Sequence, residues 1–313
     1  MLIDFFDRLR FWQGKRIMIL NRLHFYGMIN SFVSICANLI LSLTFRASHS
    51  SERFRLSEYS HHSLRPNIIV SLTSFPRRLP TLHLVIEGLL RQSVKPDKIV
   101  LYLTQSQVPD VEKLPHKLLA LRKRGLEIRL CPDEIRSHTK YYYAMQEFPE
   151  DIVITVDDDL FYRSDLVESL LKHHKEHPGH IIANWVKRIN SDTDRYAWWP
   201  DVTDRPQASN RFLLLGVSGV LYPPYSLHPD TFNVENIKAL SLTADDVWLS
   251  AMAIRQGTPI FYTHYRYNHL PVHIRNNETL ISGNYVRNQQ CVDAINAHYA
   301  AKGEPRPFID IPD

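Results

Sequence analysis

Three consecutive aspartates, Asp157 to Asp159, follow the apolar, β-branched run at residues 152–156. Such a run is typical of a strand buried on both faces of a parallel sheet. Ligands of open α/β sheets collect beyond the carboxyl ends of the strands, so the aspartates stand where a site is expected. Because side chains alternate along a strand, Asp157 and Asp159 can face one ligand while Asp158 points elsewhere. Adjacent carboxylates repel one another, which raised pKa values or a bound divalent cation can relieve, and hard oxygen ligands at this spacing suit Mg²⁺ or Mn²⁺ carrying a diphosphate.

The acidic residues also have a purely structural explanation. Aspartate and serine commonly cap helices, and Asp159 or Ser164 is placed to cap a helix that begins near Asp165. A second acidic pair, Asp245 and Asp246, opens another predicted helix. One acid at a helix N-terminus is an ordinary cap and dipole partner, so the other acid of the pair is the informative one.

Histidines and tryptophans offer further candidates. His173 and His177 share a helix face, but no glutamate lies between them in the HExxH register, and we interpret this face as a solvated helix end. Trp198 and Trp199 lie in a polar context. Exposed aromatic rings stack on sugar faces, which would make these two residues acceptor-binding, whereas the alternative is that they cap the core.

The elements that would position these groups alternate between strands and helices from residue 67 onward. We predict strands at residues 67–73, 98–104, 126–131 and 152–156, and helices at 80–92, 114–124 and 139–147. This order implies a parallel sheet with right-handed crossovers, in which the carboxyl ends of the strands share a rim. Besides the aspartate trio, that rim would carry Thr73, Arg77, Arg78, Asp133, Arg136 and Lys140.

The chain after the trio is predicted to form a second half. It comprises a helix at 165–177, a strand at 181–189, a buried strand or strand pair at 212–222, a helix at 244–256 and a strand at 259–263. Gly216 and Gly219 interrupt the apolar segment at 212–222. Glycine inside a strand marks a bulge or a place where a ligand approaches the backbone.

Composition sets limits on function. The 313 residues are 44% hydrophobic and 22% charged, which is enough for one large domain or two. A net charge of +4 fits anionic nucleotides or a membrane surface and is too weak to indicate nucleic acid. Cys36, Cys131 and Cys291 form no CxxC pair, which predicts a reducing compartment without disulfides. Neither GxGxxG nor GxxxxGK[ST] occurs, so a bound nucleotide must be held through metal and side chains.

The N-terminal region contains an apolar run at residues 27–45 that is nearly long enough to cross a bilayer. Asparagines and serines interrupt the run, and basic residues flank it on both sides. This pattern favours a helix lying in the membrane interface, with a true span or a soluble helix on the catalytic domain as alternatives. A cleaved signal peptide is not expected, because the run starts late and no small-residue cleavage site follows it.

These observations predict four segments. Residues 1–47 form a helical, membrane-interfacial extension and 48–66 a polar linker. Residues 67–300 form the α/β domain, with halves at 67–160 and 161–300, and resemblance to a known enzyme family implies that this domain is catalytic and that the halves bind a nucleotide and an acceptor. Residues 301–313 form a weakly ordered tail.

Between residues 67 and 275 the chain resembles the GT-A glycosyltransferases, particularly bacterial family-2 enzymes that build lipopolysaccharide or capsule. The resemblance rests on SLTSFPRR after the first strand, on VDDD as a DxD motif at the end of the fourth strand, and on ADDVW at 244–248. It implies an α/β, Rossmann-like fold with a mostly parallel central sheet flanked by helices, preceded here by the helical extension. It also implies a site that binds a nucleotide-diphosphate sugar with Mn²⁺ or Mg²⁺.

By this resemblance, Asp246 or Asp245 is the catalytic base, and Asp246 is preferred. A glycine-containing segment such as 212–222 lies under the donor sugar. A late histidine, His269 or His273, would contact metal or phosphate. The implied sets are Thr73, Arg77, Asp133, Lys140, Asp157 and Asp158 for the nucleotide sugar, and Asp157, Asp159 and His273 for the metal.

One feature departs from the family pattern. Family-2 enzymes usually carry an aspartate just after the second strand to hold the base, whereas residues 103–106 (LTQS) contain none. Asp133, after the third strand, is a possible substitute. The base is therefore left open, with a UDP-sugar favoured as donor.

The sequence as a whole predicts a metal-dependent, inverting glycosyltransferase. It would transfer a sugar to a saccharide or glycolipid hydroxyl in surface-glycan synthesis, at the cytoplasmic face of the inner membrane and without nucleic acid. A sugar nucleotidyltransferase is one alternative, although residues 74–78 lack the glycine that its phosphate loop needs. A non-catalytic glycan-binding or scaffold protein of the same fold is the other.

Overall fold

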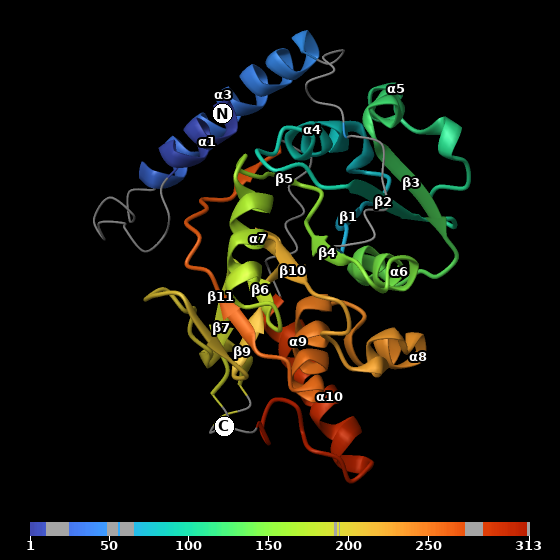
Figure 1. Cartoon of the computed structure of the whole chain (residues 1–313), viewed down its shortest axis with the longest axis vertical. Coiled ribbons are helices and arrows are strands. Elements are labelled where there is room, and N and C mark those ends of the chain that lie inside the picture. The colour runs from blue at the N-terminus through green and yellow to red at the C-terminus, as the bar shows by residue number, and fades with distance from the viewer. Residues whose placement is uncertain are drawn as a thin grey trace.

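The computed structural model describes residues 1–10, 25–48, 56, 66–190, 193, 195–272 and 284–311. A central sheet has the strand order β3-β2-β1-β4-β10-β6-β11-β8, and helices flank it (Figure 1). All of its strands except β10 and β8 run in the same direction. The predicted class is therefore confirmed: an α/β, Rossmann-like fold with a mostly parallel central sheet flanked by helices and an N-terminal helical extension.

The strands of this sheet are β1 (Ile68–Thr73), β2 (Lys98–Thr104), β3 (Leu126–Cys131), β4 (Ile152–Thr155), β6 (Ile181–Ala183), β8 (Gln207–Ser209), β10 (Val220–Tyr222) and β11 (Ile260–Tyr262). Two small pairs lie beside it: β5 (Leu160–Phe161) with β12 (Leu270–Pro271), and β7 (Val186–Arg188) with β9 (Phe212–Leu214).

The α-helices are α1 (Leu2–Leu9), α3 (Phe25–Ala47), α4 (Leu79–Leu89), α5 (His116–Leu119), α6 (Thr139–Glu147), α7 (Leu166–Glu176), α8 (Val234–Asn236), α9 (Asp245–Gln256) and α10 (Asn284–Ala301). The bounds of β2, β3 and α6 are those that the sequence pattern predicts. The reason is that their apolar periodicity ends sharply in polar or glycine residues.

Residues 212–222 form the strand pair that was one of the two predicted possibilities, β9 and β10, separated by a turn at Gly216–Ser218. The structure differs from the predicted elements in two places. Residues 181–189 contain two strands in different sheets, because the chain turns at Asn184, whose side-chain amide donates to the Ser218 carbonyl oxygen at 2.9 Å. The helix expected at 114–124 is only α5 and a 3-10 segment, which ends at Gly125 in the left-handed region (φ +103°).

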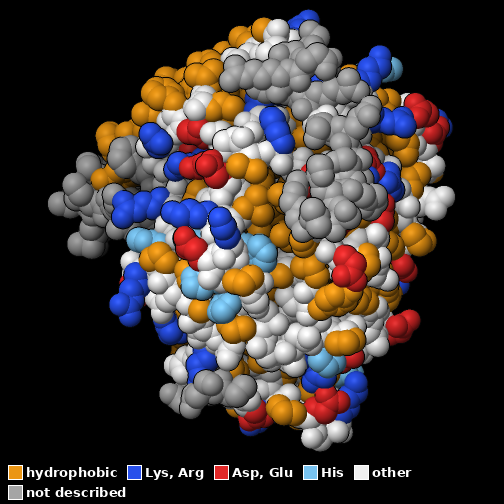
Figure 2. Space-filling view, in the orientation of Figure 1, with side chains coloured by type: hydrophobic (Ala, Val, Ile, Leu, Met, Phe, Trp, Pro, Cys, Tyr) orange, Lys and Arg blue, Asp and Glu red, His pale blue; other side chains and the backbone are white. Residues whose placement is uncertain are grey.

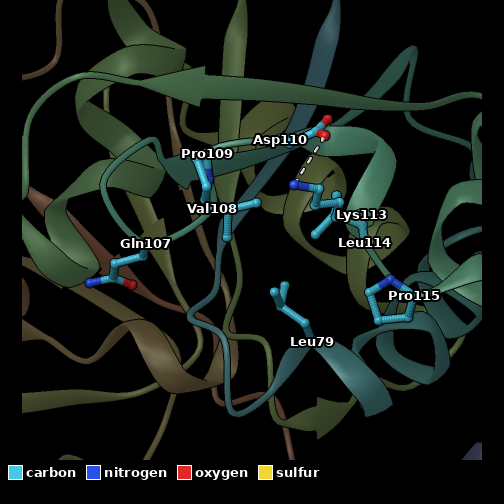
Figure 3. A pocket seen from close by; sticks show the side chains of 8 residues that line it. All are labelled: Leu79, Gln107, Val108, Pro109, Asp110, Lys113, Leu114 and Pro115. Carbon is cyan, nitrogen blue, oxygen red and sulfur yellow. Dashed lines mark ion pairs between the residues drawn. The ribbon is translucent and has the colours of Figure 1, made fainter.

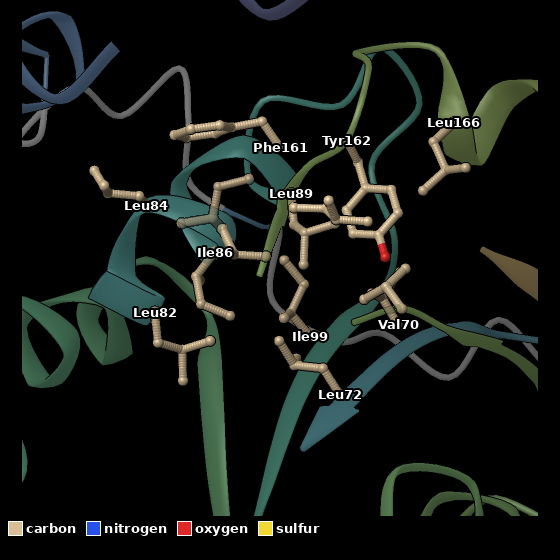
Figure 4. Close-up of a cluster of buried hydrophobic side chains, with 14 of the residues drawn as sticks. Val70, Leu72, Leu82, Leu84, Ile86, Leu89, Ile99, Phe161, Tyr162 and Leu166 are labelled. Atoms are coloured by element: carbon tan, nitrogen blue, oxygen red, sulfur yellow. The ribbon is translucent and has the colours of Figure 1, made fainter. Parts of the chain in front are cut away.

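Apolar side chains fill both sides of the sheet. On one side, Val70, Leu72 and Ile99 meet Leu82 and Ile86 of α4 (Figure 4). On the other side, α6 packs on β1 and β2, while α9 and α10 form a second core beyond β10. The core thus fixes the carboxyl ends of β1 and β4 relative to the N-termini of α6 and α9.

The tail is more ordered than the sequence suggests. Phe308 is fully buried, and its ring contacts the Trp199 ring at 5.6 Å between centroids. Its backbone N–H donates to Asn296 Oδ1 of α10 at 3.1 Å. The expectation of weak order is therefore wrong up to residue 311, because a single aromatic side chain anchors the segment in the second core.

Candidate functional site

The aspartate trio leaves the carboxyl end of β4, as predicted, and its middle member turns inward. The Asp158 side chain is buried and accepts a hydrogen bond from Ser74 Oγ at 2.5 Å. Arg78 pairs with the other Asp158 oxygen and also with Asp159, at 3.0 Å from Nη2 to Oδ2. Burial raises the pKa of Asp158, and Arg78 opposes that shift. Asp158 therefore anchors the loop and leaves Asp157 and Asp159 for a ligand.

Arg78 is the arginine that contacts the trio. It lies at the N-terminus of α4, with one guanidinium facing two carboxylates. Arg77, which the sequence places near the nucleoside, is an exposed neighbour. The difference follows from the turn after β1, in which only one of two adjacent side chains can point back toward β4.

Asp157 and Asp159 have the chemistry of a divalent-cation site. Their side chains are 29% and 31% exposed, and among the described residues Asp157 pairs with Lys140 and Asp159 with Arg78, each through one carboxylate oxygen. Burial and the neighbouring Asp157 raise the pKa of Asp159 to about 6, against the influence of Arg78. The described residues contain no cluster of three or more metal-ligating side chains. Mg²⁺-type ions are commonly held by one or two carboxylates together with substrate phosphates, so this pair fits such an ion.

Lys140 connects the trio with the second acidic pair. Its ammonium group lies 2.8 Å from Asp157 Oδ1 and 3.0 Å from Asp245 Oδ2, and its side chain is 5% exposed. Burial alone would lower the pKa of Lys140, but Asp157 and Asp245 raise it well above its ordinary value. The sequence places Lys140 near the phosphates, and the structure places it between two carboxylates that are 88 residues apart in the chain.

Asp245 and Asp246, at the start of α9, have opposite environments. Burial tends to raise the pKa of Asp245, but Lys140 and His138 lower it to about 2, and Ser137 Oγ donates to it at 2.8 Å. Burial and Asp245 raise the pKa of Asp246 to about 8. Asp245 is thus a fixed anion, and Asp246 is the acid that can exchange a proton near neutral pH.

The turn at Gly216–Ser218 lies directly against Asp246. The Gly216 N–H donates to Asp246 Oδ1 at 2.9 Å, and a Cβ atom on Gly216 would lie only 2.8 Å from that oxygen. Tyr162 joins the same turn to the trio, because its hydroxyl accepts from the Asp157 N–H (2.7 Å) and donates to the Val217 carbonyl (3.0 Å). At Gly216 the group that approaches the backbone is therefore a carboxyl group of the protein, and the approach of a ligand there stays a prediction.

Two predicted nucleotide-binding residues use their polar groups within the fold. Thr73 Oγ1 donates to the Tyr102 carbonyl at 2.9 Å, across to β2. The Asp133 carboxylate accepts from the Tyr143 hydroxyl at 2.8 Å and remains partly exposed. Both residues lie at the predicted rim, and their contact with a nucleotide stays a prediction.

The structure describes only one of the two late histidines that the family resemblance implies as contacts of metal or phosphate. His273 lies outside the described residues. His269 Nε2 bonds with Ser218 Oγ at 2.7 Å, and its ring stacks on Trp185 at 5.0 Å between centroids. Burial lowers the pKa of His269 to about 4, so the ring stays neutral. His269 thereby supports the turn that holds Asp246.

The two tryptophans have different places, and the structure corrects the prediction for one. Trp199 is 1% exposed and packs against Tyr196 and Phe308, so it belongs to the core and cannot stack on an acceptor. Trp198 is 62% exposed, with the Arg195 guanidinium 4.7 Å from its ring centre. Of the pair, Trp198 alone offers a ring face to a ligand. The reason is that adjacent residues of an extended or 3-10 segment point in different directions.

The other histidine prediction also changes. His177 stacks on Phe261 at 4.1 Å between ring centroids, and His173 lies 5.3 Å from the same ring. These rings are partly packed against β11 rather than simply solvated.

A pocket of about 170 Å³ lies near the carboxyl end of β2, where the sequence lacks the expected base-binding aspartate. Leu79, Val108 and Leu114 line it, with Asp110 and Lys113 at its edge (Figure 3). None of the acidic site residues lines this pocket.

The sequence pattern does not single out Ser74 and Ser137, which donate to site carboxylates, or Tyr162, which accepts from the Asp157 N–H. Ser137 and His138 precede α6 and contact residues more than 100 positions later, Ser137 at Asp245 of α9 and His138 at the Ser241 carbonyl just before α9. Their spacing carries no local signal. Ser74 stands out in the sequence only as part of the SLTSFPRR segment.

No known protein-family profile matches the chain, and no curated protein sequence was found to be similar to it. Among solved structures, the mannosyltransferase PcManGT from Pyrobaculum calidifontis, in complex with GDP-Man and Mn²⁺, is 12% identical with a TM-score of 0.44, over 90% of this chain and 77% of its own. CMP:2-keto-3-deoxy-manno-octonic acid synthetase, complexed with CTP, is 14% identical with a TM-score of 0.36, over 63% and 88%. These similarities are distant, and function is inferred from the site itself.

Proposed function

We propose that the protein is a metal-dependent, inverting glycosyltransferase of the GT-A type. The observation that carries this proposal is the position of Lys140, whose ammonium group contacts Asp157 on one side and Asp245 on the other. Lys140 thereby connects Asp157 and Asp159, a carboxylate pair suited to a metal-bound diphosphate, with the second acidic pair. That pair includes Asp246, whose raised pKa suits it to accept a proton. A single displacement at a sugar carbon needs these two parts on one site.

Asp157 and Asp159 would hold the divalent cation, which neutralises charge on the departing diphosphate. Asp246 would accept the proton of the acceptor hydroxyl while the oxygen of that hydroxyl forms a bond to the anomeric carbon. The bond from that carbon to the diphosphate oxygen breaks in the same step, so the configuration inverts. Burial and the neighbouring Asp245 would hold the proton affinity of Asp246 high, while Lys140, paired with Asp245, opposes that shift.

The proposed donor is a nucleotide-diphosphate sugar, with a UDP-sugar favoured, and the proposed acceptor is a saccharide or glycolipid hydroxyl in surface-glycan synthesis. The proposed compartment is the cytoplasm. Three thiols without a disulfide, Cys36, Cys131 and Cys291, agree with a reducing compartment.

Nucleotide binding tests the donor site directly. We expect one of UDP, GDP, CMP and dTDP to bind in calorimetry only when Mn²⁺ is present. Asp159→Asn is expected to weaken this binding by about 10-fold to 100-fold, because the ion loses a charged ligand. Glu112→Gln, at a surface ion pair with Arg122, is the matched control and should bind as the wild type does.

Two results would contradict the proposal. Failure of all four nucleotides to bind with Mn²⁺ would favour the scaffold alternative. Release of pyrophosphate from a nucleoside triphosphate and a free sugar would identify a nucleotidyltransferase instead.

The raised pKa of Asp246 predicts that the rate of the reaction depends on pH. Its pKa is raised to about 8, so the carboxyl group is protonated and inactive as a base below that pH. We expect kcat/KM, at fixed metal and donor, to rise about tenfold per pH unit up to that pKa and then to level off. The residual activity of Asp246→Asn should lack this rise. A wild-type profile that is flat across the neutral range would remove Asp246 from the role of base.

A further inference from the structure

The N-terminal helices α1 and α3 lie side by side on the outside of the domain, and their outer faces are apolar. Hydrophobic side chains gather along this edge of the molecule in Figure 2. The members that are 56% to 68% exposed are Phe5, Met28, Phe32, Ile35, Leu39 and Leu43. A continuous apolar surface on two neighbouring helices is far larger than the single exposed residues of ordinary protein surfaces, and it indicates a docking surface.

The inner faces of the same helices are fixed to the domain. Ala37, Leu41 and Phe45 of α3 are buried in the first core. The Asn38 side chain donates to the Pro271 carbonyl at 2.9 Å, and the guanidinium of Arg91, which follows α4, lies over the Phe45 ring. By length and composition, α3 is the one helix of the described chain that could cross a membrane. Crossing would strip these contacts from the domain, so the packed helix fits a position along a surface.

The charges on the two helices are sorted. The acids of α1, Asp4 and Asp7, turn inward, where Asp4 accepts hydrogen bonds from Ser164 and Asp7 accepts one from the Asn268 N–H. From Phe25 to Phe45, α3 contains no charged residue. Arg8 and Arg46 are exposed. An apolar face with exposed bases and inward acids is complementary to a bilayer with anionic headgroups, whereas a protein interface normally keeps a mixed polar rim.

This face is one layer away from the proposed metal site. The strand β12 lies between them: the Pro271 carbonyl accepts from Asn38 of α3, and the next residue, Val272, donates its N–H to the Asp159 carbonyl at 2.8 Å. The Phe45 ring of α3 also contacts the Phe161 ring of β5. These direct contacts therefore fix the position of the metal-site carboxylates relative to α3.

We propose that α1 and α3 together form a docking surface for a lipid bilayer with anionic headgroups, in which α3 lies in the membrane plane. The apolar side chains enter the headgroup boundary, and Arg8 and Arg46 bind lipid phosphates at its rim. The docking holds the acidic site at a fixed height above the membrane, within reach of an acceptor that is carried on a lipid. The docking itself does not depend on the reaction that the site catalyses, whereas the lipid-carried acceptor rests on the proposed function.

Vesicle flotation of the full chain tests the surface. Wild-type protein should float with vesicles of phosphatidylcholine that contain about one-third phosphatidylglycerol, and less with phosphatidylcholine alone. Phe32→Glu with Leu39→Glu should lower the partition coefficient about 100-fold or more, because two apolar contacts become charges. Arg8→Glu with Arg46→Glu should lower binding to the anionic vesicles about tenfold or more. Val286→Glu, an equally exposed position on α10, is the control that should keep binding.

Three outcomes would overturn the proposal. The double glutamate variant of α3 could bind vesicles as the wild type does. The wild type could ignore vesicles and instead form a dimer that the same variant dissociates, which would identify a second copy as the occupant. Protein loaded on one vesicle population could fail to move to fresh vesicles, which would indicate a span, since an in-plane helix leaves the bilayer reversibly.

Discussion

Replacing Asp246 by asparagine is expected to lower kcat by about 10²- to 10⁴-fold, the range that a positioned general base contributes. The affinity for the nucleotide should stay unchanged, because Asp246 lies against Gly216 and is separated from the donor carboxylates by Lys140. The fold should also tolerate the change. With a pKa raised to about 8, Asp246 is already neutral at pH 7, and the asparagine carbonyl can still accept from the Gly216 N–H.

Steady-state kinetics together with nucleotide calorimetry and thermal unfolding would check this expectation. Glu235→Gln, the same acid-to-amide change at an exposed position of α8, is the control for general effects. Unchanged turnover in Asp246→Asn would exclude this residue as the base. Lost nucleotide binding would show that it acts on the donor side instead.

Replacing Lys140 by methionine is expected to lower the free energy of unfolding by about 3–5 kcal/mol, which is the cost of leaving buried charges without a partner. In the described part of the chain, Lys140 and Arg78 are the cations that form ion pairs with four of the five carboxyl groups of the site, Asp157, Asp158, Asp159 and Asp245. Without Lys140, Asp157 and Asp245 lose an ion pair at 2.8 Å and 3.0 Å. Activity should fall with stability, because the two acidic pairs lose the group that connects them.

Denaturant unfolding of Lys140→Met and of Lys238→Met would measure this effect. Lys238 is 48% exposed and lies 4.0 Å from Asp133, so its removal should change stability by less than about 1 kcal/mol. Mn²⁺ should recover part of the stability of Lys140→Met, since the cation would replace some of the lost positive charge near Asp157. Equal, small losses in both variants would show that Lys140 is not the link between the acidic pairs.

Local sequence patterns determined much of the secondary structure of this protein and the position of the aspartate trio. The apolar runs and their polar or glycine ends predict β2, β3 and α6 at their observed bounds and place Asp157 to Asp159 beyond β4. The alternation of strands and helices predicts the parallel half of the sheet. These features follow from the sequence because backbone geometry repeats over a few residues and imposes a period on the side chains.

The tertiary structure decided which groups meet. Asp245 and Asp246 look alike in the sequence, yet their pKa values shift in opposite directions. Lys140, His138 and Ser137 lower the pKa of Asp245 against the effect of burial, whereas burial and the neighbouring Asp245 raise the pKa of Asp246. Trp198 and Trp199 likewise separate into an exposed ring and a core ring. The sequence by itself therefore determined the elements and the acidic motifs, whereas the fold decided burial and long-range pairing. Those depend on residues that are distant in the chain and leave no periodic trace in it.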